Sequence, residues 1–374
     1  MIMNTFEAFK LKTNPFRMTP AVNSDELIWA GFPEIKRKFE DRIKRSISIP
    51  NTSLILNWGE YGSGKTHASR YFNKESVLQE LSGKAGRAMP YSCVIDFPRS
   101  KEPVNDIYTQ IIDKLDIKKI REDFRESGLN IGEVVQEVTD NIFIRNVLKL
   151  VFDGTVGLDL MKQFLYGNVS ATELKSFVKA GVQRKFTSDS DLAEFLGAFF
   201  SILTYDKKVC SCVIIWFDEF EDISVLNTVG LANVNSFLRF LIDKIPNNLL
   251  LFLNLTRSAM MDTADLAEYL QESVKSRIKD RIELSMPTPD DLKLYLKDLL
   301  NHPIYRIGNT GSDIYFPFEE GVIEKLISDL GDVSLRRFNE AFSLLLESAV
   351  FDNRDHITLE YYNQIRNEII GWKE

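Results

Sequence analysis

Residues 53–69 read SLILNWGEYGSGKTHAS, and the rest of the chain is best interpreted from this stretch. A short apolar run, Leu54 to Leu56, leads into the eight residues Gly59 to Thr66. These eight match the pattern G-x-x-x-x-G-K-[ST] at every fixed position, and a helix-compatible segment follows them. The order strand, loop, helix is the setting that this motif requires. We therefore predict a phosphate-binding loop, with a glycine-rich surface turn as the alternative.

Each residue type in this loop has a role in binding a nucleotide. Glycines let the backbone curl so that successive N–H groups point toward phosphate oxygens. The following helix presents its positive end to the same anion. Lys65 is expected to neutralise charge on the β- and γ-phosphates, and the Thr66 hydroxyl to bind Mg²⁺. The residues expected at the nucleotide are Gly59, Tyr61, Gly62, Ser63, Gly64, Lys65, Thr66 and His67.

A second motif lies far along the chain, where the apolar run Val213 to Phe217 ends in Asp218 and Glu219. A continuous apolar run is typical of a parallel strand that is covered on both faces. Asp218 would then stand at the carboxyl end of the strand, where open α/β sheets bind their ligands. We expect Asp218 in the Mg²⁺ shell and Glu219 as the group that polarises an attacking water. An acidic turn after a core strand is the alternative.

A further buried strand is predicted over Leu249 to Leu255, and polar residues gather at its end. Side chains at this position lie beside the γ-phosphate in many enzymes with a phosphate-binding loop. Asn254, Thr256 and Arg257 are all candidates, and alternation along a strand puts the first two on one face. Thr256 is the preferred catalytic candidate of the three.

Composition limits the class of protein. Of the 374 residues, 44% are apolar and 27% are charged, so the chain can build a full core and is not a disordered protein. The net charge of −8 means that any nucleic-acid surface must be local. The three cysteines, Cys93, Cys210 and Cys212, make neither a disulfide framework nor a metal set, which favours buried thiols in a reducing cytoplasm.

No apolar run reaches the 18 or so residues of a membrane span, and the N-terminus has no secretory apolar region. We therefore expect a soluble, cytoplasmic protein with no membrane partner. The one basic feature is a predicted helix over 33–49, where six cations face two acids between Lys36 and Arg45. A solvated helix face is the simpler interpretation, and contact with DNA or RNA phosphates is the alternative.

The order of the elements predicts three parts. Residues 1–34 form an aromatic-rich lead-in that packs on the core and could supply a wall for the adenine. Residues 35–287 form a nucleotide-binding core, interrupted by a helical insertion over about 118–205 with Ser170 and Glu173 as a capping box. Residues 288–374 form a helical lid, with Gly331 as a helix cap and Ser334 opening the helix that carries Arg336 and Arg337.

Together these motifs resemble the AAA+ ATPases, most of all the origin-recognition and initiator-loader branch and the related STAND NTPases. The resemblance implies an α/β fold: a parallel five-stranded sheet flanked by helices, with a helical lid domain. Lys65 and Thr66 then form Walker A, and Asp218 and Glu219 form Walker B. It further implies Asn254 or Thr256 as sensor 1, Arg277 as an arginine finger for a neighbouring subunit, and Arg336 as sensor 2.

Four features depart from the family pattern. The spacing from Gly331 to Arg336 is longer than usual, so Arg336 and Arg337 are not distinguished, and Arg257 could instead be the sensor arginine of STAND proteins. Long insertions before a D-E-x-E strand end resemble ATPases found with bacterial phage-defence systems. The chain also ends after the lid, without the winged-helix domain of initiators, which makes sequence-specific DNA recognition less expected.

These observations lead to two hypotheses for function. In the first, the protein is an Mg²⁺-dependent ATPase that assembles with copies of itself as a nucleic-acid-associated loader or regulator, and Arg277 completes the neighbour's site. In the second, it is an ATP-dependent switch that recruits a protein partner with slow or no turnover. A P-loop kinase is a third alternative, disfavoured by the distance between the two motifs and by the helical lid.

Overall fold

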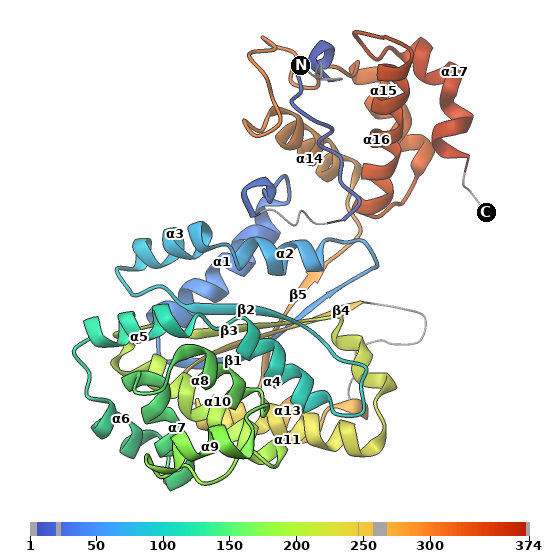
Figure 1. The fold of residues 1–374 in the computed structure, drawn as a ribbon. Helices are drawn as coiled ribbons and strands as arrows, with labels where there is room; N and C mark the ends of the chain where they lie inside the picture. Colours follow the sequence, from blue (N-terminus) through green and yellow to red (C-terminus); the bar gives the residue numbers. More distant parts are fainter. Residues whose placement is uncertain (1–5, 20–23, 246, 257–267, 372–374) are drawn as a thin grey trace. The chain divides into compact units, whose positions relative to one another are not determined.

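The computed structural model describes residues 6–19, 24–245, 247–256 and 268–371 of the chain (Figure 1). The chain forms two compact units, each built from separate stretches of sequence. The sheet unit comprises Phe39–Asn57 and Phe72–Ile282. The loop–lid unit comprises Met1–Lys38, Trp58–Tyr71 and Glu283–Glu374. The phosphate-binding loop thus belongs to the unit that also contains the C-terminal helices.

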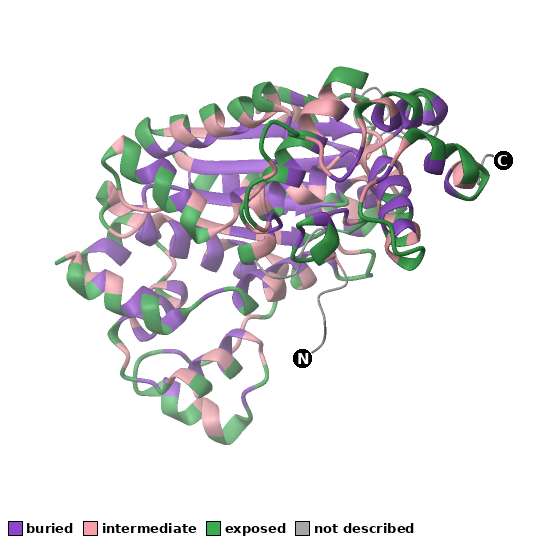
Figure 2. Cartoon of the chain, turned by 90° about the horizontal axis from the view of Figure 1, so that it is seen from above, coloured by how far each residue is buried: buried purple, intermediate pink, exposed green. Residues whose placement is uncertain are grey.

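Five strands form one sheet in the order β2-β3-β4-β1-β5. Their bounds are β1 Asn51–Gly59, β2 Tyr91–Asp96, β3 Val213–Asp218, β4 Asn248–Thr256 and β5 Ile278–Leu284. The β2–β3 and β3–β4 pairs are parallel, and Asp96 stands opposite Asp218. All six residues of β3 are buried, which explains its unbroken apolar sequence (Figure 2). On β3 and β4, Trp216 and Phe252 stack with their ring centroids 3.8 Å apart.

Strand β5 is longer than the sequence indicates. The stretch Ile282-Glu283-Leu284, with two apolar residues on one face, predicts a short strand, whereas β5 begins four residues earlier, at Ile278. The added residues alternate between half-buried and exposed, with Lys279 and Arg281 exposed. Because β5 lies at an edge of the sheet, only part of it needs apolar side chains. The sequence pattern of residues 278–281 therefore does not predict a strand.

Helices cover both faces of the sheet (Figure 1). The predicted basic helix forms as α1, Pro33–Ser48, and buries Phe39, Ile43 and Ile47. The rings of Phe39 and Trp216 lie 5.9 Å apart, so α1 packs directly on the central strands. Among the described residues, the sheet unit's other helices outside the insertion are α3 Glu75–Ala85, α4 Pro103–Asp113, η4 Phe220–Val225, α11 Thr228–Lys244 and α13 Glu272–Lys275.

The predicted insertion is helical, as expected. It contains α5 Ile117–Glu126, α6 Ile131–Val138, α7 Ile142–Asp153, α8 Leu158–Leu165, α9 Ala171–Val178, α10 Asp189–Leu203 and η3 Tyr205–Lys207. The capping box of Ser170 and Glu173 forms at the start of α9. The apolar stripe of α10 is core, since Phe195 and Phe199 are fully buried and α10 packs against α4 and α11. The insertion is therefore continuous with the layer that covers one face of the sheet.

The lid contains α14 Pro289–Asn301, α15 Glu320–Leu330, α16 Leu335–Phe351 and α17 Leu359–Ile370. Its apolar core includes four residues of the lead-in: Phe9, Leu11, Phe16 and Ala30. The rings of Phe16 and Phe342 lie 5.5 Å apart. Two short 3₁₀ helices, η1 Glu7–Phe9 and η2 Ser24–Glu26, belong to this lead-in. The first part of the lead-in therefore packs on the lid helices, whereas the sequence predicts packing on the nucleotide-binding core. In the part of the chain that the structure describes, no helix is long and apolar enough to cross a membrane.

Candidate nucleotide-binding site

The loop between β1 and α2 (Lys65–Phe72) has the curled backbone that its sequence predicts. Gly62 and Gly64 have φ values of +77° and +99°, in the region that residues with a Cβ rarely adopt. A Cβ on Gly62 would lie 2.9 Å from Cβ of Arg336 and 3.0 Å from Oγ of Ser334. Glycine is therefore needed at this position for two reasons, the backbone turn and the close approach of α16.

Lys65 stands at the first position of α2 and is 7% exposed. Its ammonium donates to the carbonyl oxygens of Gly59 and Glu60, at 2.9 and 2.8 Å. These acceptors are neutral, whereas phosphate oxygens carry negative charge and form stronger hydrogen bonds with an ammonium group. A bound phosphate could therefore replace the two carbonyl oxygens as the acceptor for the Lys65 ammonium group.

The N-terminus of α16 contacts the loop, and the two lid arginines there, Arg336 and Arg337, have different partners. The Arg336 guanidinium lies over the Tyr61 ring, 4.4 Å from its centroid, and also donates to the Tyr61 hydroxyl. Arg337 instead binds Glu340, at 2.7 Å, and the carbonyl oxygen of Ile369. Sequence reasoning left these two residues equivalent. The structure places Arg336 at the loop and turns Arg337 into the lid.

The second part of the lead-in runs along α2. The Trp29 ring lies 5.4 Å from that of Tyr71 and 6.1 Å from that of His67. Nε2 of His67 is 2.7 Å from the carbonyl oxygen of Ile28, and burial lowers the pKa of this imidazole. His67 is therefore held by the lead-in, so its side chain already has a structural partner. The expected adenine wall stays a prediction, with Trp29 as its nearest aromatic candidate.

In the sheet unit, three polar side chains from three strands form one hydrogen-bonded row. Nδ2 of Asn57 on β1 donates to Oδ1 of Asn254 on β4, at 2.7 Å. Nδ2 of Asn254 donates in turn to Oδ1 of Asp218 on β3, at 2.9 Å. Asn57 and Asn254 are fully buried and Asp218 is 5% exposed. The Asp218 carboxylate is therefore held by Asn254, and Asn254 is itself held by the hydrogen bond from Asn57.

Glu219 follows Asp218 in the left-handed backbone region, with φ +53°. A residue with a Cβ rarely occupies this region, and such positions concentrate at functional sites. Desolvation, together with the nearby charges of Asp222 and Asp218, raises the pKa of Glu219. Arg99 acts in the opposite direction: its guanidinium lies 3.8 Å from Glu219 and donates to Asp222. A carboxylate with a raised pKa is a better base for accepting a proton from water.

The other predicted site residues have different surroundings. Thr256 donates its backbone N–H to Glu221, at 3.1 Å, so it is Asn254 rather than Thr256 whose side chain the structure brings to Asp218. Arg277 pairs with Asp243 on α11, at 2.6 Å, and donates to the carbonyl oxygen of Ser273. Arg257 lies outside the described residues. The role of Arg277 as a finger stays a prediction.

Sequence reasoning missed two residues that the structure brings to the acidic cluster. Asn57 is a lone amide in the buried run Leu54 to Trp58, and a polar residue in such a run is a signal that could have found it. Arg99 lies in the loop that follows β2 and carries no comparable signal in the sequence. Its relevance depends on the β2–β3 register, which brings the ends of these strands together.

The donor chemistry fits magnesium. Among the described residues, no group of three or more His, Cys, Asp or Glu side chains can hold a metal ion. Mg²⁺ keeps several waters and is bound by one or two protein oxygens plus substrate phosphate, so it does not require such a group. In the sheet unit, Asp218 supplies a carboxylate of which one oxygen is engaged by Asn254, and a carboxylate is a donor of the kind that Mg²⁺ takes.

Comparisons with known proteins identify the fold. No family model and no curated protein sequence matches the chain. The structure of the ORC2 protein of Aeropyrum pernix, with ADPNP and ADP, aligns over 91% of this chain and 68% of that protein, with 14% identity and a TM-score of 0.53. The ORC1 protein of the same organism in complex with DNA aligns over 95% and 69%, with 14% identity and a TM-score of 0.48. Cdc6p of Pyrobaculum aerophilum aligns over 99% and 72%, with 13% identity and a TM-score of 0.49.

The chain therefore shares the fold of the ORC2 protein, and its parallel five-stranded sheet with flanking helices and a C-terminal helical domain agrees with the AAA+ fold expected from the sequence. This confirms the fold predicted from the sequence.

Proposed function

We propose that this protein binds and hydrolyses MgATP and works as an oligomeric, nucleic-acid-associated AAA+ loader or regulator. The observation that carries the proposal is the loop itself: an intact Walker A sequence in which Gly62 and Gly64 adopt the positive φ values of a curled anion-binding turn. The order of the sheet supports the same conclusion, because only β4 separates the acidic end of β3 from β1, the strand that leads into the loop.

The residues divide the chemistry as follows. Lys65 and the N–H groups of the loop bind the phosphates, and the hydroxyl of Thr66 and the carboxylate of Asp218 hold the metal. Bound Mg²⁺ supplies positive charge that neutralises the phosphate oxygens. Glu219 accepts a proton from the attacking water, which its raised pKa favours. Asn254 orients Asp218, and is the better supported of the two candidates for sensor 1.

Assembly supplies the last cation. We assign Arg277 to the site of a neighbouring copy, as the resemblance implies; its ion pair with Asp243 then has to exchange for phosphate when subunits join. Arginine fingers contribute on the order of 10³–10⁵ in rate in well-studied NTPases. Turnover per subunit should therefore rise with protein concentration, and Arg277→Ala should remove that rise.

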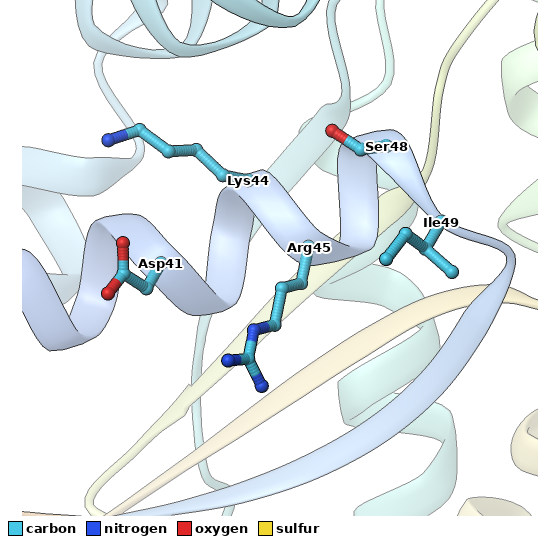
Figure 3. A pocket seen from close by; sticks show the side chains of 5 residues that line it. All are labelled: Asp41, Lys44, Arg45, Ser48 and Ile49. Atoms are coloured by element: carbon cyan, nitrogen blue, oxygen red, sulfur yellow. The ribbon is translucent and has the colours of Figure 1, made fainter.

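The surface proposed for nucleic acid is the basic face of α1. Two of its cations already have acidic partners. Arg42 is paired with Asp280, and Lys44 binds Glu40 at 2.9 Å. A hollow of about 340 Å³ beside Lys44 and Arg45 is also lined by Asp41, Ser48 and Ile49. Figure 3 shows the Lys44 and Arg45 side chains on different sides of the helix. Because the two cations do not converge, this surface fits an extended phosphate backbone better than a small anion.

The alternative is an ATP-dependent switch that recruits a protein partner without rapid turnover. The contact between Arg336 and Tyr61 favours it, because a nucleotide bound at the loop would act directly on the lid. Glu219→Gln separates the two functions. MgATP binding should persist in both cases, measured by calorimetry, while hydrolysis falls. A loader driven by turnover then stops, whereas a switch keeps its partner-bound state.

A further inference from the structure

Asn57 is a buried amide for which the proposed mechanism has no role. It lies on β1 between Leu56 and Trp58, two residues before Gly59, and is fully buried. An apolar side chain would pack in a central strand without needing hydrogen bonds, so an amide here calls for a physical reason. The reason lies in its neighbours on β4 and β3.

The direction of the hydrogen-bonded row is set by the charge at its end. An ionised Asp218 only accepts hydrogen bonds, so Asn254 must present its NH₂ group to it. The Asn254 oxygen then faces Asn57, which must present its own NH₂ group. Turning either amide by 180° would place two oxygens against each other. Asn57 thus supports the one orientation of Asn254 that suits Asp218.

The cost of this arrangement is visible in the structure. Oδ1 of Asn57 is buried and has no hydrogen-bond partner among the described residues. A buried acceptor without a partner is destabilising. An amide retained under that penalty contributes through its donor group, which is the group that reaches Asn254.

We propose that Asn57 is a positioning residue that orients Asn254 and, through it, Asp218 for metal binding. The inference rests on the proposed function, since it assigns Asp218 to the Mg²⁺ shell. The row ties Oδ1 of Asp218 to Asn254 and leaves Oδ2 as the acceptor for the hydrated metal. It also links the strand that leads into the phosphate-binding loop to the acid on β3 through side chains rather than through the backbone.

The test measures metal dependence separately from nucleotide affinity. Asn57→Leu keeps a similar volume and removes the donor. Its affinity for ATP in EDTA should stay within about twofold of the wild type. The Mg²⁺ concentration for half-maximal enhancement of ATP binding should rise roughly fivefold, the effect of losing one hydrogen bond. Ser53→Ala, which removes a buried hydroxyl bonded to Asn51 on the same strand, is the matched control and should leave that concentration unchanged.

A double-variant cycle identifies the route. Asn254→Ala should shift the Mg²⁺ dependence at least as far, and adding Asn57→Leu should shift it no further, because both changes break the same row. Asn57→Ala serves in place of the leucine variant if that one does not fold. An unchanged Mg²⁺ requirement in a folded Asn57 variant, or additive effects of the two changes, would overturn the inference alone. Failure of the wild type to bind MgATP would instead refute the proposed function and the positioning role with it.

Discussion

The two lid arginines provide a sharp test of the site, because they are adjacent in sequence and have different partners. Arg336 lies over Tyr61 of the loop, and Arg337 binds Glu340 and Ile369 inside the lid. We expect Arg336→Ala to weaken binding of ATP and to leave binding of ADP nearly unchanged. We expect Arg337→Ala to leave both affinities unchanged, so it serves as the matched control.

The expected loss of ATP affinity follows from the two contacts that Arg336 exchanges when ATP binds: it gives up Tyr61 and gains the γ-phosphate. Its contact with the Tyr61 ring is worth only about 0.5–1 kcal/mol, because Tyr61 is 66% exposed. A charge-assisted hydrogen bond to a γ-phosphate oxygen is worth about 1.5–3 kcal/mol. The net gain from this exchange is about 0.5–2.5 kcal/mol, so its loss should lower ATP affinity roughly 2- to 70-fold. Because ADP lacks the γ-phosphate, the ratio of the two affinities isolates the arginine.

Isothermal calorimetry with the non-hydrolysable ATP analogue and with ADP measures this ratio. Tyr61→Phe adds a second check, since it keeps the ring under Arg336 and removes the hydroxyl that receives its N–H. Its ATP affinity should stay close to that of the wild type or rise slightly. If Arg336→Ala binds both nucleotides as the wild type does, or if Arg337→Ala carries the loss, the assignment of Arg336 is wrong.

Two further predictions concern charged groups. Arg99 lowers the pKa of Glu219, so Arg99→Ala should raise that pKa and shift the rise of the ATPase rate to higher pH. The measurement is kcat from pH 5 to 9. An unchanged pH profile would show that Glu219 is not the base or that Arg99 does not influence it. In the lid, Arg366 is the main cause that holds the pKa of Asp329 well below its usual range, and Tyr362 adds to it. Asp329→Asn should therefore lower the free energy of unfolding, measured with urea near pH 7, by about 2 kcal/mol. This difference between variant and wild type should shrink as the pH falls below about 4. A constant difference down to pH 3 would contradict the prediction.

The parts predicted correctly from the sequence are those whose signals are local. The loop from Gly59 to Thr66 and the apolar runs of β3 and β4 each lie within a few residues, so pattern and physics coincide there. The fold followed from their order along the chain. The lid helices and the capping box at Ser170 were likewise readable, because caps and apolar spacing act within one helix.

The parts that were missed depend on which strands and helices become neighbours. Asn57 and Asn254 are far apart in sequence and meet only because β1 and β4 are adjacent in the sheet. Arg336 and Arg337 differ only in the direction each side chain takes from α16. The charged half of β5 looks like a loop because an edge strand needs little apolar surface. None of these relations has a local pattern in the sequence.

The central claim is that the loop after β1 grips a triphosphate through Lys65. Calorimetric titration of Lys65→Ala with MgATP tests it most directly, with Lys297→Ala as the control, because Lys297 is an exposed lysine on α14. The account predicts a loss of at least roughly 10-fold in ATP affinity for Lys65→Ala, since charge-assisted bonds to phosphate are removed, and none for Lys297→Ala. ATP binding by Lys65→Ala that is as tight as that of the wild type would contradict it.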